Sequence, residues 1–171
     1  MLTTLIVLSA LAAGLAGQDQ PKDVPSAKTP ARTDLNFLVD AGVLIHATSQ
    51  YSALANERAT PNVEKFAAQV AESHQQMQKR LAAAIKDQNV GVAAGTEKVT
   101  KEEVKRLREL EGKAFDRAYL ARMVTDHRKL IELCENQVKN GKDAELSAFA
   151  ESILPGLRKH LETAEGLSKD R

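Results

Sequence analysis

The sequence predicts an all-α protein, in which four long helices pack as a four-helix bundle and a short extra helix lies in the connection between helices 2 and 3. Aromatic residues make up only 4% of the chain and Trp is absent, whereas Ala, Leu, Glu and Lys are frequent. These frequent residues lose little side-chain freedom in a helix. Apolar residues also recur at helical spacing in four long segments. Two tight turns and one long connection join the segments, which is typical of a bundle.

The first two helices are predicted on either side of a tight turn. The first runs from Asp34 to Ala59, and the second from Pro61 to about Asp87. Thr60 is suited to the N-cap position, where a side-chain oxygen can accept a backbone N–H. Pro61 stands at the first helical position, where its missing N–H costs nothing. The turn therefore ends one helix and starts the next.

The connection to the third long helix is predicted to contain a loop and a short helix. Residues 88–98 include two glycines and are interpreted as the loop. Thr100 and Glu103 have the spacing of a capping box, in which each side chain binds the other residue's backbone N–H. This spacing predicts a short helix that opens at Thr100 and stops at Gly112.

A second tight turn separates the third and fourth long helices. The third is predicted from about Ala114 to Asn140, and the fourth from Asp143 to about Ser168. Gly141 follows Asn140 directly, and this pair is a strong signal for the end of a helix because glycine adopts the backbone conformations found there.

The residues that precede the bundle indicate export. An apolar run from Leu5 to Leu15 is followed by small residues, which is typical of a secretory signal peptide over residues 1–17. The run is shorter than the roughly 20 residues that span a bilayer, so the mature chain is expected to lack a transmembrane segment. An uncleaved N-terminal anchor is the alternative. Residues 18–33 contain three prolines among polar residues and are predicted as a disordered linker to the bundle at 34–168.

Charge and cysteine content narrow the classes of partner and site. The chain has 24 basic and 23 acidic residues, and this balance creates no field strong enough to attract nucleic acid. No nucleic-acid partner is therefore expected. The composition does not identify a protein partner, and a homo-oligomer stays open. Cys134 is the only cysteine. It cannot form an internal disulfide and is interpreted as a small buried hydrophobe.

Each of the four long helices carries one histidine, namely His46, His74, His127 and His160. On a helical wheel His46 lies opposite the apolar stripe and is predicted to face solvent, whereas the other three lie within their stripes. His74 and His127 lie near the middle of their helices and can meet at one level. His160 is offset by ~8 Å along its helix. Three core imidazoles on facing stripes indicate a candidate site for iron, zinc or copper.

Two other interpretations stay open. An unpaired buried imidazole costs roughly 1–3 kcal/mol, so the three rings could form a hydrogen-bonded network in a structural or stress-related interaction protein without metal. A redox enzyme with a di-iron centre would need inward carboxylates and Glu-x-x-His pairs. The residues three positions before the core histidines are instead Ala71, Val124 and Leu157. The acids Glu72, Asp126 and Glu162 lie on other faces and are predicted to be solvated, although Asp126 could orient a neighbouring ring.

Three stretches of the sequence resemble a known family. They are Ala114–His127 (AFDRAYLARMVTDH), Gly141–Asp143 (GKD) and Leu154–Leu161 (LPGLRKHL). These stretches resemble the bacterial domain-of-unknown-function family DUF4142, exported proteins grouped with the ferritin-like folds, and the resemblance covers Phe37–Leu167. It implies a ferritin-like bundle in the periplasm or cell envelope, with no established reaction.

The resemblance also bears on the candidate metal site. It implies that His74, His127 and His160 occupy the family's histidine positions. In the first helix the family commonly carries Glu-x-Glu, and the matching positions here are Thr48, on the inward face, and Gln50. A core carboxylate that could complete a metal site is therefore absent. The function expected is non-catalytic binding of a transition-metal ion by an exported bundle whose biochemical activity is unknown.

Overall fold

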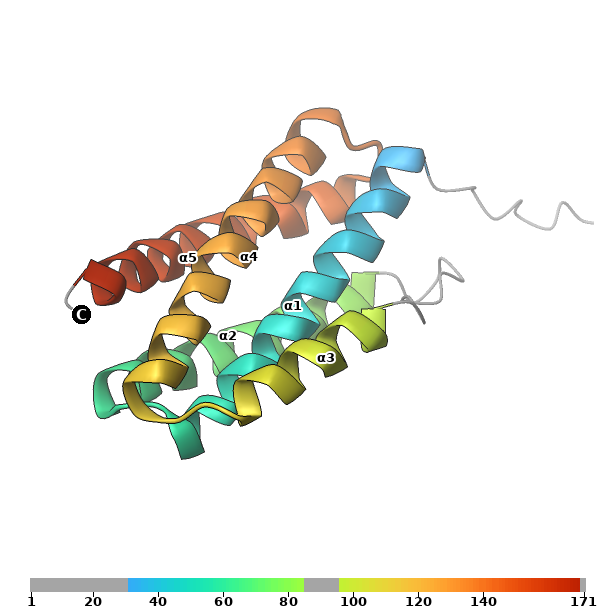
Figure 1. The fold of residues 1–171 in the computed structure, drawn as a ribbon. Coiled ribbons are helices and arrows are strands. Elements are labelled where there is room, and N and C mark those ends of the chain that lie inside the picture. Colours follow the sequence, from blue (N-terminus) through green and yellow to red (C-terminus); the bar gives the residue numbers. More distant parts are fainter. Residues whose placement is uncertain (1–30, 85–95, 170–171) are drawn as a thin grey trace, which may run out of the picture.

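Five α-helices make up the computed structural model over the residues that it describes, 31–84 and 96–169 (Figure 1). They are α1 (Arg32–Arg58), α2 (Pro61–Ala84), α3 (Thr96–Arg108), α4 (Gly112–Asn140) and α5 (Ala144–Lys169). These ranges contain no strand, so the all-α prediction is confirmed. The predicted signal peptide, most of the predicted linker and most of the predicted loop before α3 lie outside the described residues.

Helices α1, α2, α4 and α5 form the four-helix bundle. α1 packs against α2 and α4, and α5 packs against the same two helices (Figure 1). At one end of the bundle the Thr60 hydroxyl, in the α1–α2 turn, donates to Asp116 in the first turns of α4 at 2.7 Å. At the other end Gln137, near the end of α4, donates to Asp34 in the first turn of α1 at 2.7 Å. α1 and α4 are therefore antiparallel neighbours.

The long connection returns along the bundle through α3. This helix lies beside α1 and leads back to the start of α4 (Figure 1). Leu107 and Thr100 hold α3 against the bundle, since both side chains are buried. Because α3 crosses back, α2 and α4 run parallel to each other, which is the topology of ferritin-like folds with a single crossover connection.

The ends of α3 differ from the prediction. The helix begins at Thr96, so Thr100 lies in its interior and is not its N-cap. Thr100 and Glu103 share the capping-box spacing because residues three apart also lie on one face of a continuous helix. The helix ends at Arg108, and Gly112, with a φ of 53°, opens α4 instead of ending α3. Glycine suits that position because a left-handed backbone strains other residues.

Polar groups at the other turns fix where the helices start. Pro61 is the first residue of α2, as predicted, and the Thr60 carbonyl accepts the N–H of Glu64 at 2.9 Å. Asp143 caps α5, because its Oδ1 accepts the N–H groups of Glu145 (2.9 Å) and Leu146 (3.0 Å). The long helices otherwise begin and end close to the predicted residues.

The buried apolar side chains form two clusters, one in each half of the bundle. The first contains, among others, Phe37, Leu38, Ile45, Leu130, Phe149 and Leu157. The second contains, among others, Tyr51, Phe66, Val70, Phe115, Tyr119 and Met123. Cys134 belongs to the first cluster and is fully buried, which confirms its interpretation as a core residue. Each long helix of the bundle passes from one cluster to the other through a single short segment.

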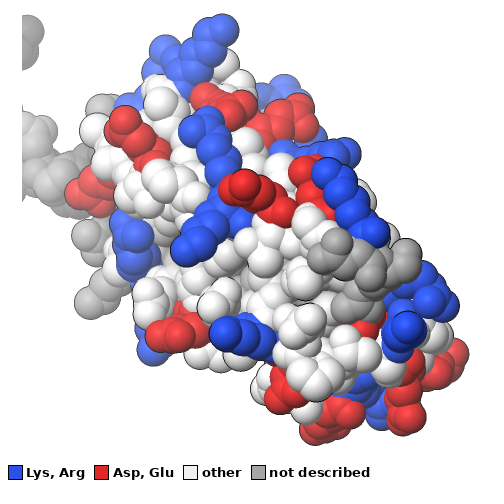
Figure 2. All heavy atoms as spheres, turned by 90° about the vertical axis from the view of Figure 1, so that its left-hand side faces the viewer, with Lys and Arg blue, Asp and Glu red and all other residues white. Residues whose placement is uncertain are grey.

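The surface of the bundle carries charges of both signs. On the face drawn in Figure 2, acidic and basic side chains lie side by side around uncharged areas. Some of them pair between helices, such as Arg158 with Glu135 at 2.8 Å. None of the described helices combines the length and the apolar character that a membrane crossing needs.

Candidate metal centre

A layer of polar side chains separates the two apolar clusters. It consists of Thr48 from α1, His74 from α2, His127 from α4 and His160 from α5, and it is called the histidine layer below. On α2, for example, Val70 belongs to the second cluster, Met77 to the first, and His74 lies between them. All four long helices of the bundle therefore contribute one residue to this level of the core.

The three histidines predicted from the sequence come together in this layer. Their ring centroids are 5.1 Å apart for His74 and His127, 5.4 Å for His127 and His160, and 5.7 Å for His74 and His160. One nitrogen of each ring lies within 4.8 Å of a nitrogen of the other two. The offset estimated for His160 does not separate it, because His127 and His160 lie at comparable distances from the α4–α5 turn.

The protonation of His127 is fixed by a backbone carbonyl. Its Nδ1 lies 2.9 Å from the carbonyl oxygen of Met123, one turn earlier in α4. A carbonyl oxygen only accepts hydrogen bonds, so Nδ1 carries the hydrogen. The other ring nitrogen, Nε2, is then a lone-pair donor, and it is buried with no hydrogen-bond partner among the described residues.

The protonation of His74 follows from its contact with Thr48. The Thr48 hydroxyl lies 2.7 Å from the carbonyl oxygen of Leu44, which takes its single hydrogen. The same oxygen lies 2.5 Å from His74 Nδ1 and therefore accepts the hydrogen of that nitrogen. His74 Nε2 is left with its lone pair, buried and without a partner among the described residues.

His160 forms the outer side of the layer. Its Nδ1 is buried without a hydrogen-bond partner in the described part of the chain. The ring meets the edge of Phe66, with the centroids 6.3 Å apart. His74 and His127 are fully buried, whereas His160 is only partly covered. The layer is therefore closest to solvent at α5.

Burial keeps all three imidazoles neutral near pH 7. It lowers the pKa of His127 to about 4, with a further contribution from His160. Burial also lowers the pKa of His74 well below its usual value, with His127 and His160 adding to the effect. The pKa of His160 is lowered by burial and then by Lys159. Neutral imidazole is the form that binds a metal ion.

No carboxylate joins the three histidines, among the residues that the structure describes, in the group of side chains close enough to share an ion. Glu72 and Glu162 are exposed, as predicted. The prediction for Asp126 is wrong, because this side chain is buried and accepts a hydrogen bond from Arg122 Nε at 2.8 Å. Burial raises the pKa of Asp126, and the guanidinium of Arg122 opposes that rise.

Asp126 also does not orient the ring of His127, since the carbonyl of Met123 has that role. The role of this carbonyl could not be predicted, because every residue has a backbone acceptor. The burial of Thr48 confirms the prediction that it lies on the inward face of its helix. Its contact with His74 was not predicted. His46 is exposed, as predicted, and lies outside the histidine layer, with Gln78 Nε2 at 3.4 Å from its Nδ1.

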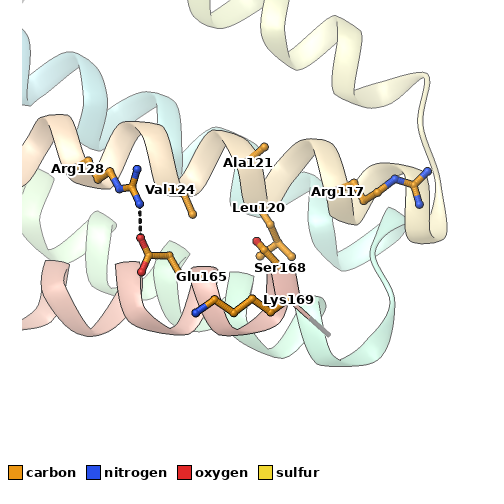
Figure 3. Close-up of a pocket in the computed structure, with 8 residues that line it drawn as sticks. All are labelled: Arg117, Leu120, Ala121, Val124, Arg128, Glu165, Ser168 and Lys169. Atoms are coloured by element: carbon orange, nitrogen blue, oxygen red, sulfur yellow. Dashed lines mark hydrogen bonds and ion pairs between the residues drawn. The ribbon is translucent and has the colours of Figure 1, made fainter. Parts of the chain in front are cut away.

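A surface groove lies between α4 and α5 (Figure 3). Its volume is about 640 Å³. The residues that line it are Arg117, Leu120, Ala121, Val124, Arg128, Glu165, Ser168 and Lys169. Glu165 is paired with Arg128 at 2.6 Å, and no residue of the histidine layer lines the groove.

The fold and the site define an all-α, ferritin-like four-helix bundle with three histidines in one core layer. The model of the family "Domain of unknown function (DUF4142)" matches residues 19–167, and the chain belongs to this family. The crystal structure of a DUF305 fragment from Deinococcus radiodurans is similar, with a TM-score of 0.72 and 16% sequence identity over 83% of this chain and 99% of that chain. At that identity the likeness shows the fold alone. No curated protein matches the sequence.

Proposed function

We propose that this protein is an exported, non-catalytic metal-binding bundle in which His74, His127 and His160 bind one transition-metal ion. One observation carries the proposal. Each of the three rings has a buried nitrogen with no hydrogen-bond partner among the described residues, and the rings share a single layer of the core.

A metal ion would satisfy these three nitrogens together. Leaving a buried polar group unpaired costs roughly 1–3 kcal/mol, so three of them in one layer are a large penalty for a bundle of this size. Neutral imidazole nitrogen binds zinc, copper and iron. The pKa values of the three histidines, lowered chiefly by burial, keep the rings in the form that such an ion needs.

The distances are compatible with closure around an ion. Nitrogens bound to zinc at 2.0–2.1 Å in tetrahedral geometry are roughly 3.4 Å apart. One nitrogen from each of the three rings lies within 4.8 Å of one from each of the others, so small side-chain rotations would bring three nitrogens to bonding distance.

Two contacts in the bundle support this donor set by holding the rings. The Met123 carbonyl and the Thr48 hydroxyl each accept an Nδ1–H, from His127 and His74 respectively. Such contacts orient a ligating imidazole and increase its basicity. In both rings Nε2 therefore keeps its lone pair, and Nε2 is also the nitrogen that has no hydrogen-bond partner among the described residues.

The alternative is a structural bundle whose histidines pack in the core without binding metal. The contacts between the three imidazole rings favour this alternative. Centroid distances of 5.1–5.7 Å are those of aromatic rings in direct contact. A redox enzyme with a di-iron centre has less support, because the group that the described residues form contains no carboxylate to bridge two ions.

Export to the periplasm or cell envelope is part of the proposal. The apolar run at residues 5–15 and the small residues after it support it. Mass spectrometry of the full chain after expression in a bacterium tests it. A mature protein that begins near residue 18 in the envelope fraction is expected, and an intact N-terminus in the cytoplasm would contradict export.

Metal content tests the binding proposal. The full chain, purified without chelator, is expected to hold one metal ion per chain by elemental mass spectrometry and to rebind zinc at that ratio after chelation. His127→Ala should lose this binding. His46→Ala is the matched control, because it removes an exposed histidine outside the layer, and it should bind like the unchanged protein.

Two outcomes would overturn this proposal. Metal-free protein that takes up no zinc, copper or iron would overturn it. Equal binding by the His127→Ala and His46→Ala variants would also overturn it, since binding would then occur elsewhere. If His127→Ala fails to fold by circular dichroism, His127→Gln gives the same test with a side chain closer in size.

A further inference from the structure

We infer that the metal ion of the histidine layer keeps one coordination position for a small exogenous anion that enters past His160. The inference rests on the proposed function and goes beyond it. It names a second kind of ligand, an anion from solution.

The charge of the donor set requires such a ligand. The three imidazoles are neutral, and no carboxylate of the described residues joins the group. A divalent ion held by them alone would place its full charge between two apolar clusters. An uncompensated buried charge is strongly unfavourable. An anion bound to the ion removes most of this cost.

The acids nearest in sequence to the ligands cannot provide the compensation. Asp126 is turned to Arg122, and their ion pair already neutralises its charge. Glu72 and Glu162 are exposed and are not part of the group that can share an ion. No acid in the described ranges 31–84 and 96–169 supplies the anion, so the proposed source is solution.

Thr48, the fourth residue of the histidine layer, does not fill the remaining coordination position either. The Thr48 hydroxyl donates its hydrogen to the carbonyl of Leu44 and accepts the hydrogen of His74 Nδ1. The hydroxyl hydrogen and one of the two oxygen lone pairs are used in these contacts, and as a neutral group Thr48 would bring no charge. Three protein ligands and one exchangeable ligand is the arrangement typical of an open tetrahedral site.

The path for exchange lies on the side of α5. His74 and His127 are fully buried, whereas the ring of His160 is only partly covered. A ligand from solution therefore reaches the ion beside His160. The ligand proposed is a small anion, such as hydroxide from water, a halide or azide.

The probe is azide added to the full chain loaded with Co²⁺, in a buffer free of halide and carboxylate. A saturable change in the visible absorption of the bound Co²⁺ is expected. By linkage, azide should also raise the apparent affinity for Co²⁺, by about tenfold at an azide concentration ten times its dissociation constant. The His46→Ala variant should give the same response. The His127→Ala variant should give none.

The outcomes separate this inference from the proposed function. If the protein binds no Co²⁺, both are overturned. If one Co²⁺ binds per chain but its spectrum and affinity are unchanged by azide, the proposed function stands and the exchangeable position is overturned. An azide response that persists in the His127→Ala variant also overturns the inference, because the signal then arises outside the layer.

Discussion

The hydroxyl of Thr48 in α1 lies 2.5 Å from Nδ1 of His74 in α2 and joins the two helices at the level of the three histidines. Its hydrogen is taken by the carbonyl of Leu44, so the hydroxyl can only accept from the imidazole. The contact thus sets which nitrogen of His74 is free. It connects the first helix, which supplies no candidate ligand, to the candidate metal centre.

Removing this acceptor should weaken metal binding. Thr48→Val keeps the shape of the side chain but removes the hydroxyl that accepts from His74 Nδ1, and a tenfold or larger loss of zinc affinity is expected, the usual effect of losing a group that orients a ligand. Thr48→Ser keeps the hydroxyl and should bind nearly as before. Isothermal titration measures both. Equal affinity in the two variants would show that the contact does not orient the ring.

Acid should destabilise the metal-free protein. The folded-state pKa of His127 is about 4, below the unfolded value of 6.5, chiefly because of burial. Below pH 6.5 the unfolded chain therefore binds more protons, and the free energy of unfolding falls until about pH 4. His127 alone should account for about 2 kcal/mol between pH 7 and pH 5. His74 and His160 act in the same direction.

Urea unfolding at pH 7, 6 and 5 measures this loss. The His127→Gln variant should show a smaller loss, because glutamine does not titrate, whereas His46→Ala should lose as much as the unchanged protein. A free energy of unfolding that stays constant from pH 7 to pH 5 would mean that the three rings are not buried in neutral form.

Asp34 should stabilise the end of the bundle at which it lies. Its carboxylate accepts from the Gln137 side chain at 2.7 Å and from the Lys142 N–H at 3.0 Å. Asp34→Ala leaves these donors without their acceptor and should lower the free energy of unfolding by about 1–3 kcal/mol. Asp40→Ala is the control, because Asp40 lies on the same helix and is exposed. Similar effects of the two variants would contradict the assigned role.

Cys134 should be unreactive in the folded protein. Burial raises the pKa of its thiol to about 12, with a further contribution from Glu135. The reactive species is the thiolate, so a thiol reagent at pH 8 should label the folded chain very slowly and the urea-unfolded chain at once. Fast labelling without urea would show that this part of the core opens readily.

The bundle and the meeting of His74 and His127 could be predicted from the sequence because both depend on local rules, whereas the place of His160 in the same layer stayed open. Helical periodicity places His74 and His127 on the apolar faces, and the turn signals at Pro61 and Gly141 set where the helices change direction. Once neighbouring helices are antiparallel, residues at comparable distances from a turn meet. His160 reaches the layer for this reason.

Other features depend on tertiary contacts, which the helical periodicity of the sequence does not reveal. The start of α3 was misplaced because the Thr100 and Glu103 spacing occurs inside helices as well as at their ends. The burial of Asp126 was missed, although Arg122 four residues earlier was a usable signal for an ion pair on one helix face. The hydrogen bond to the carbonyl of Met123 cannot be predicted from the sequence, because every residue has a backbone carbonyl.

X-ray absorption spectroscopy of the zinc-loaded full chain tests whether the three imidazoles share one metal ion. Zinc is expected to have three nitrogens at about 2.0–2.1 Å, with the outer-shell scattering of three imidazole rings. His127→Ala should abolish zinc loading and with it this signal. Zinc surrounded by oxygen atoms with no more than one imidazole would show that the three rings do not share an ion.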